Sequence, residues 1–172
     1  MKKISLIILA VLVSALSFAQ SPLSGAWTMS VKIFGTRVTE NLNFDCNGEG
    51  TVVSTLDLDM TLKLFGNYVQ SGATYTMKGV YTYEGDKIVM KWDSDSYTAV
   101  HKEGGVYTVD GQNDENLKKE TIGDLDSLAD SFRRDKKGDE VFTKVKISGD
   151  KLRYSSVDSN GKDTSGTFSR VK

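Results

Sequence analysis

Apolar and polar residues alternate along most of this chain, and the alternation is clearest in its first half. Between residues 51 and 66, five apolar side chains recur at every second position, with polar or charged residues between them. These apolar residues are Leu56, Leu58, Met60, Leu62 and Leu64. A period of two places successive side chains on opposite faces of a strand, whereas a helix would scatter such residues around its axis. The pattern predicts either one long bent strand or two strands that meet near Asp57.

The same period predicts strands in most of the remaining chain, joined by short turns rich in Gly, Asn and Asp. Strand 25–33 carries Trp27 and three further apolar residues on one face, and Gly79 predicts a bulge or bend within strand 72–84. Residues 93–96 read as a loop, and residues 97–102 and 106–110 as a weaker hairpin around two glycines. The other predicted strands are 37–44, in which Glu40 is a polar exception on the apolar face, 87–92, 141–147, 151–157 and 164–172.

One segment, residues 114–137, follows a helical period instead. Its apolar residues recur at spacings near 3.6, and they are Leu117, Ile122, Leu125, Leu128, Ala129 and Phe132. Asn113 or Asp114 is suited to cap the start, and Gly138 is suited to end the helix. Acidic residues early and basic residues late in the segment also match the helix dipole.

Many short strands with Gly-rich turns and a single helix predict an all-β fold. We expect an antiparallel up-and-down β-barrel of about 8–10 strands, because closing the sheet removes exposed strand edges. The helix is inserted before the last three strands. No low-complexity segment or composition shift divides the chain, so residues 20–172 are expected to form one domain.

The first 19 residues read as a secretory signal peptide. Lys2 and Lys3 precede an apolar run too short for a comfortable membrane span, and small residues end at Ala19. No Cys lies near this cleavage site, so we expect a soluble periplasmic or secreted protein that starts near Gln20. The formal net charge is −1, which gives no general attraction to nucleic acid.

The residues that could carry catalysis are few. The single His, His101, has no Ser in a nucleophile context, and the single Cys, Cys46, lies in a turn and leaves no disulfide. One His and one Cys also make a tetrahedral zinc site very unfavourable. The carboxylates around Asp45 and Asp158 suit turns better than a calcium loop, because the late bidentate Glu is missing. We therefore expect no enzymatic activity, no metal and no cofactor.

The remaining candidate site is the apolar face of the predicted barrel. An eight-stranded barrel is just wide enough to be filled by side chains or to hold one small ligand, and Met-rich linings adapt to irregular ligands. The sequence therefore leaves open a filled core and a cavity for a small hydrophobic molecule. The candidate ligand-binding residues are Phe44, Leu56, Leu58, Met60, Leu62, Tyr75, Met77 and Met90.

Gly25-Ala26-Trp27 at the entry to the first strand resembles the G-x-W motif of lipocalins, most closely the small lipocalin-like domains of exported bacterial proteins. In that family a late Arg lies across the first-strand Trp, and Arg170 on the last strand is the matching candidate. The resemblance implies a soluble calyx that binds a small apolar molecule and has no catalytic activity.

Two other functions fit an exported barrel. One is a structural or protein-binding barrel with a filled core. The other is an eight-stranded outer-membrane barrel, which would need apolar residues facing outward and usually ends in an aromatic residue. This chain ends in Arg170, Val171 and Lys172, which favours the soluble alternatives.

Overall fold

The computed structural model describes residues 21–33, 35–45, 50–136, 138–157 and 161–172. The predicted signal peptide, its cleavage site and Cys46 lie outside these residues. Within the described residues the chain forms ten strands and one helix. Their bounds are Gly25–Ile33 (β1), Thr36–Asp45 (β2), Thr51–Leu64 (β3), Asn67–Glu84 (β4), Lys87–His101 (β5), Val106–Val109 (β6), Gln112–Asn113 (β7), Glu115–Asp135 (α2), Asp139–Ser148 (β8), Lys151–Val157 (β9) and Asp163–Arg170 (β10).

Eight of these strands close into an antiparallel barrel. Around the barrel the order is β1, β2, β3, β4, β5, β8, β9 and β10, and β10 pairs back onto β1. The helix precedes the last three strands. This confirms the fold class that the alternation predicted, and the run around Leu56 proves to be one long strand rather than two.

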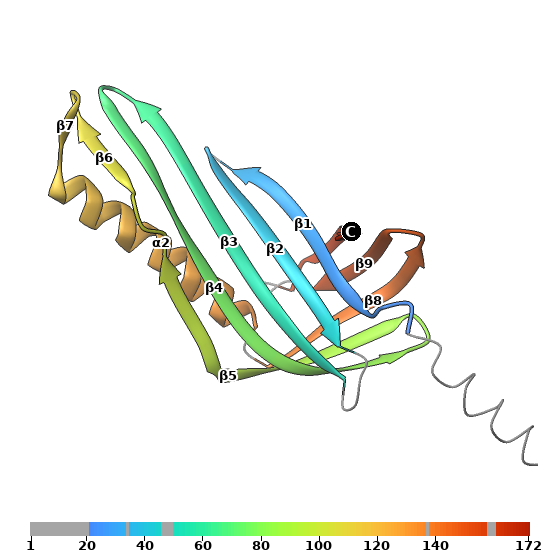
Figure 1. The fold of residues 1–172 in the computed structure, drawn as a ribbon. Coiled ribbons are helices and arrows are strands. Elements are labelled where there is room, and N and C mark those ends of the chain that lie inside the picture. The colour runs from blue at the N-terminus through green and yellow to red at the C-terminus, as the bar shows by residue number, and fades with distance from the viewer. Residues whose placement is uncertain (1–20, 34, 46–49, 137, 158–160) are drawn as a thin grey trace, which may run out of the picture.

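The barrel is closed over only part of its length. β1 pairs with β10 only at Trp27 and Thr28, and β5 pairs with β8 only between Ile88 and Lys91. The far parts of β1 to β5 continue as a curved sheet, which β6 and β7 widen beside β4 (Figure 1). We call this part the extended sheet. It consists of residues 29–33 of β1, 36–40 of β2, 56–64 of β3, 67–75 of β4 and 99–101 of β5, together with β6 and β7, and we call the remainder of the strands the closed barrel.

Helix α2 lies against the extended sheet rather than across the outside of the closed barrel (Figure 1). The Asp114 carboxylate accepts a hydrogen bond of 2.7 Å from the Leu117 backbone N–H, which makes Asp114 the cap. The buried stripe of the helix is formed by Thr121, Leu125, Ala129 and Phe132, and the buried Lys136 directly follows the last helical residue. The expectation that Leu128 belongs to this stripe is wrong, because its side chain is 44% exposed.

The predicted hairpin of residues 97–102 and 106–110 is also wrong. The end of β5 pairs with β4 at residues 73–76, and β6 pairs with β4 at residues 67–70. The two segments therefore follow one another along the same edge of β4. β4 is 18 residues long, and β6 provides partners for backbone groups that β5 does not reach.

The predicted loop at residues 93–96 lies within β5 as a large bulge. Thr76 on β4 pairs with Thr98 on β5, and the next pair is Lys78 with Asp93. Between these two pairs β4 advances by two residues and β5 by five. The Ser96 hydroxyl accepts a hydrogen bond of 2.8 Å from the Lys78 N–H and so replaces a lost ladder partner. Close to this bulge, an added methyl group at Gly79 would lie 2.5 Å from the Lys91 carbonyl oxygen, so the strands approach closely there.

Candidate functional site

The closed barrel is filled by its own side chains. A side chain that bordered a hollow large enough for water would keep accessible surface, yet Trp27, Leu42 and Met90 keep none. The same holds for most of the cluster around them. Its buried members are Leu23, Trp27, Leu42, Phe44, Val52, Ile88, Met90, Phe142, Val145, Leu152 and Phe168. A ligand in this part of the molecule would have to displace packed residues.

Trp27 and Arg170 seal one end of this core. The Arg170 guanidinium carbon lies 4.2 Å from the centroid of the Trp27 ring, and the Trp27 indole N–H donates to the Leu23 carbonyl over 2.8 Å. Arg170 also donates to the carbonyls of Pro22 and Ser24. Gly25 has a φ of 107°, and an added methyl group there would lie 3.3 Å from the guanidinium. The geometry expected for the Gly25, Trp27 and Arg170 motif is therefore present.

A second core lies between helix α2 and the extended sheet. It contains Leu56, Leu58, Met60, Val69, Ala73, Tyr75, Leu125, Ala129 and Phe132. The Tyr75 hydroxyl crosses this core and donates to the Leu125 carbonyl over 3.0 Å, which ties the helix to β4. Burial is the largest reason why the pKa of Tyr75 is raised. Here the helix covers the apolar face that opposing strands cover in the closed barrel.

A buried ionic cluster joins the two cores. The Lys136 ammonium lies 2.9 Å from a carboxylate oxygen of Glu40 on β2 and 2.9 Å from one of Glu140 on β8. It also lies 4.4 Å from the Trp92 ring centroid, and the Trp92 indole N–H donates to Glu140 over 2.8 Å. Burial alone would lower the pKa of Lys136, but the two carboxylates outweigh it and hold that pKa above its ordinary value. One ammonium thus connects the C-terminal end of α2, which Lys136 directly follows, with three strands.

The apolar inner face of the extended sheet is wider than the helix that covers it. On β1, Val31 and Ile33 share the inward parity of Trp27, and on β3, Leu62 and Leu64 share that of Leu58. Yet these four side chains are 47%, 52%, 37% and 62% exposed. The turn between β1 and β2 reaches the β3 part, because an added methyl group at Gly35 would lie 2.6 Å from the Leu62 side chain. We call Val31, Ile33, Leu62 and Leu64 the apolar shelf.

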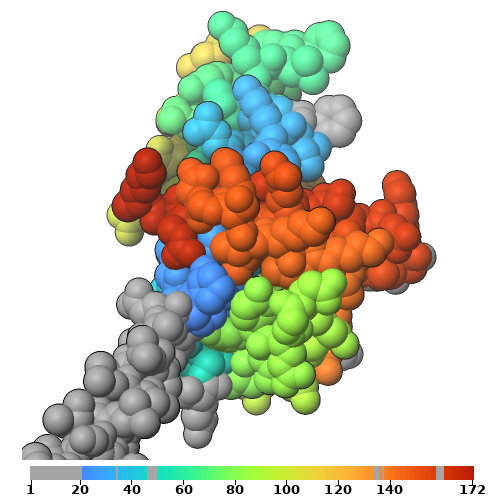
Figure 2. All heavy atoms as spheres, turned by 90° about the vertical axis from the view of Figure 1, so that its right-hand side faces the viewer, coloured from blue at the N-terminus to red at the C-terminus, as the bar shows by residue number. Residues whose placement is uncertain are grey.

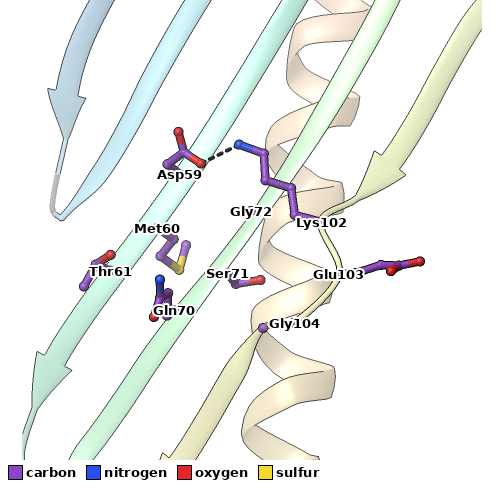
Figure 3. A pocket seen from close by; sticks show the side chains of 10 residues that line it. Asp59, Met60, Thr61, Gln70, Ser71, Gly72, Lys102, Glu103 and Gly104 are labelled. Carbon is purple, nitrogen blue, oxygen red and sulfur yellow. Dashed lines mark hydrogen bonds and ion pairs between the residues drawn. The ribbon is translucent and has the colours of Figure 1, made fainter.

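A polar cleft of about 170 Å³ lies on the opposite, outer face of the same sheet. Figure 3 shows Asp59 and Lys102 pointing toward one another across β4, while Glu103 points away. Gly72 permits this contact, since an added methyl group there would lie 2.8 Å from the Lys102 side chain. Lys102 and Asp59 are about half exposed and neutralise one another, so the cleft offers little charge to a ligand.

The candidate ligand-binding residues do not line one common space. Phe44 and Met90 belong to the closed barrel, whereas Leu56, Leu58, Met60 and Tyr75 lie beneath the helix. Met77 is fully buried, and Leu62 belongs to the exposed shelf.

Sequence reasoning missed Lys136 and its partners as a site. The available signal was Glu40, a carboxylate on the apolar face of its strand, because a buried charge requires a partner of opposite sign.

Of the two residues considered for catalysis, His101 and Cys46, the structure describes His101. His101 lies 3.1 Å from Asp126 of the helix, and both side chains are substantially exposed. Among the described residues, no group of three or more His, Cys, Asp or Glu side chains could hold a metal ion. The described part of the chain also contains no helix with the length and apolarity needed to cross a bilayer.

No protein-family model matches the chain, and neither the search of curated proteins nor the search of solved structures found a significant match. What the structure shares with a lipocalin-like fold is its closed eight-stranded antiparallel barrel.

Proposed function

We propose that this protein is an exported, non-enzymatic binding protein that carries a small apolar molecule on the apolar shelf, beside helix α2. The observation that carries the proposal is the exposure of Val31, Ile33, Leu62 and Leu64 on the inward-facing side of the sheet. Other apolar residues of this parity, such as Leu58, are buried. Exposed apolar groups that gather in one place mark binding sites more often than scattered ones do.

The rest of the molecule supports this location. The closed barrel is filled, so a ligand gains no space there without unpacking the core. The shelf, in contrast, follows on from Met60 and Leu58 along the same face of β3, and these two residues are packed beneath the helix. A ligand on the shelf would extend the second core and replace water at the margin of the helix. The signal peptide would deliver such a carrier to the periplasm or the medium.

The proposal is tested by titrating the mature protein with an environment-sensitive apolar dye, with fatty acids as competitors. We expect saturable binding that weakens at least tenfold in the Leu62→Gln/Leu64→Gln double variant. Val80→Gln/Val100→Gln is the matched control, because both valines are exposed, at 45% and 62%, on the outer face. Saturable binding that survives in the shelf variant, or that is absent from the wild type, would contradict the proposal.

A filled barrel that binds another protein is the second candidate function. It is supported by the packing of the closed barrel, because a filled barrel is a stable scaffold that presents its outer surface and strand edges to a partner and has no interior ligand site. It also takes support from an unpaired strand edge on β1.

A further inference from the structure

Strand β1 has one open edge over its second half. β1 pairs with β2 along its whole length, from Gly25 to Ile33, without a register shift. On its other side, the described strands offer it a partner only at Trp27 and Thr28, where β10 ends. In Figure 2 the blue end of β1 stands clear above the orange and red C-terminal strands. Residues 30–33 are all exposed.

The register fixes which backbone groups point out of this edge. In an antiparallel ladder, alternate residues direct both their N–H and their C=O to the same neighbouring strand. The Ala26 carbonyl accepts a hydrogen bond of 2.9 Å from the Val171 N–H, so even-numbered residues of β1 face β10. Ser30 and Lys32 therefore present two N–H and two C=O groups to the open edge. Val31 and Ile33 use theirs to bond β2.

The side chains at this edge differ between the two faces. On the inner face, a neighbour of β1 would meet Val31 and Ile33, which are apolar and exposed. On the outer face it would meet Lys32, whose cross-strand neighbour is Arg37. Both cations are exposed, and neither makes an ion pair with any residue that the structure describes. Arg37 has the carboxylate of Asp59 on β3 as its other cross-strand neighbour, so Lys32 is the cation that a new neighbour of β1 would meet directly. The edge thus joins free backbone groups, an apolar face and positive charge.

We propose that the open edge of β1 binds an extended segment of another protein as an added strand, with apolar side chains facing Val31 and Ile33 and acidic side chains facing Lys32 and Arg37. Strand addition takes its affinity from main-chain hydrogen bonds and its specificity from alternate side chains. A residue opposite Lys32 has its side chain on the outer face, where a carboxylate gains a cross-strand partner. This surface shares Val31 and Ile33 with the apolar shelf, but unlike the ligand function it depends on the backbone groups of Ser30 and Lys32 at the β1 edge.

The charge of the edge argues against a second copy of this chain as the partner. Two β1 edges paired with one another would place two Lys32 and two Arg37 side chains close together. Lys on a strand edge is a common means of preventing such self-association. The same Lys favours a partner of opposite charge, because like charges across an interface are unfavourable and opposite charges are not.

The experiment measures the binding of two fluorescent seven-residue peptides to the mature protein at low salt. In one peptide valine alternates with glutamate, and in the other valine alternates with lysine. We expect the glutamate peptide to bind at least tenfold more tightly than the lysine peptide. We also expect Lys32→Glu to reverse this preference. Equal binding of both peptides, or an unchanged preference in Lys32→Glu, would overturn the proposal.

Proline at position 30 tests the backbone contact itself. Ser30→Pro removes an N–H that faces the open edge and leaves the β1–β2 ladder intact, so we expect peptide binding to weaken at least tenfold. Ser30→Ala, which loses only the 2.9 Å hydroxyl contact with Thr39, should bind the peptide as the wild type does. Dye binding should persist in Ser30→Pro, which separates this proposal from the ligand function. Wild-type peptide affinity in folded Ser30→Pro, or a dimer abolished by that change, would contradict an acidic partner strand.

Discussion

The closed barrel and the extended sheet bury the same kind of alternating strand by different means. In the closed barrel, each inward side chain meets side chains from strands across the axis, and Trp27, Leu42 and Phe168 are completely covered. In the extended sheet none of the described strands lies opposite, and helix α2 supplies the cover. The helix is narrower than the sheet, so four inward apolar residues stay exposed.

On the functions proposed above, this difference separates stability from binding: the closed barrel supplies the first and the margin of the extended sheet the second. A core covered from all sides has no room for a ligand, but it holds the fold rigidly. A face covered by one helix leaves a margin at which a ligand or an added strand can replace water. The two parts meet at Lys136, whose partners Glu40 and Glu140 belong to strands of the barrel wall.

The largest expected effect is in the closed barrel. Trp27→Ala should lower the free energy of unfolding by about 3–5 kcal/mol, because it removes a large, fully buried aromatic side chain. Urea denaturation at pH 7 measures this loss. Val157→Ala, at an exposed position, should change the same quantity by less than about 0.5 kcal/mol. A Trp27→Ala protein as stable as Val157→Ala would show that the barrel is not the rigid part.

The second effect lies at the junction. Lys136→Met leaves two carboxylates without their cation, and breaking a buried ion pair costs about 3–5 kcal/mol. Glu40 and Glu140 are 20% and 22% exposed, so we expect a loss of about 3 kcal/mol in urea denaturation. Adding Glu40→Gln and Glu140→Gln to Lys136→Met should recover most of that loss. A single variant with wild-type stability would show that the cluster does not hold the two parts together.

The third prediction concerns the helix. Leu125 is fully buried, and Leu125→Ala should lower stability by about 2–3 kcal/mol, toward the low end for Leu to Ala changes because an open margin lets the site relax. Hydrogen exchange should show faster opening of the α2 amides, with β8 to β10 unchanged. Leu128→Ala is the matched control, since Leu128 lies on the same helix and is 44% exposed. Equal acceleration in β8 to β10 would mean that the two parts open together.

The alternation and the turn residues were sufficient for the fold class, because each strand carries its own period of two. They could not locate the ends of barrel closure, because closure depends on where β10 leaves β1 and where β8 leaves β5. Nothing in the local pattern of residues 25–33 distinguishes Trp27, which is fully buried in the closed barrel, from Ile33, which is 52% exposed.

The same limit explains why the sequence predicted the apolar face but not which part of it stays exposed. The five alternating apolar residues from Leu56 to Leu64 indicated one apolar face correctly, but three of them lie beneath a helix that is distant in sequence and two extend past it. The predicted hairpin of residues 97–102 and 106–110 is wrong for a related reason. Two glycines between two short strands suit a hairpin turn, but they also suit a loop between two segments that both pair with β4. Glu40 on an apolar face did indicate a buried charge, yet its partner Lys136 lies at the end of a helix that sequence periodicity alone could not place.

Alkaline pH should lower the stability of both the closed barrel and the extended sheet. Burial, the largest cause, and the carboxylates of Glu40 and Glu140 raise the pKa of Tyr154 to about 12. The pKa values of Lys136 and Tyr75 are also raised. A raised pKa contributes stability that is complete below the unfolded value near 10 and is lost as the pH rises through the folded value. Unfolding followed by circular dichroism from pH 8 to 13 should therefore begin above about pH 10. Tyr154→Phe should move its midpoint upward, and an unchanged midpoint would contradict the role of Tyr154.

The smallest effect is expected at the sealed end of the closed barrel, where Arg170 covers Trp27. A guanidinium over an indole contributes about 0.5–2 kcal/mol, so Arg170→Ala should destabilise the protein far less than Trp27→Ala. Because Arg170 also donates to the Pro22 and Ser24 carbonyls, its loss should free the segment before β1 and raise the access of acrylamide to Trp27. Arg153→Ala, on the exposed side of β9, is the control and should leave quenching unchanged. If Arg170→Ala left quenching at the wild-type level, the seal would lie in the strand pairing of β1 with β10. The closed barrel would then owe its dry end to backbone closure alone, and the difference from the extended sheet would reduce to the presence of β10.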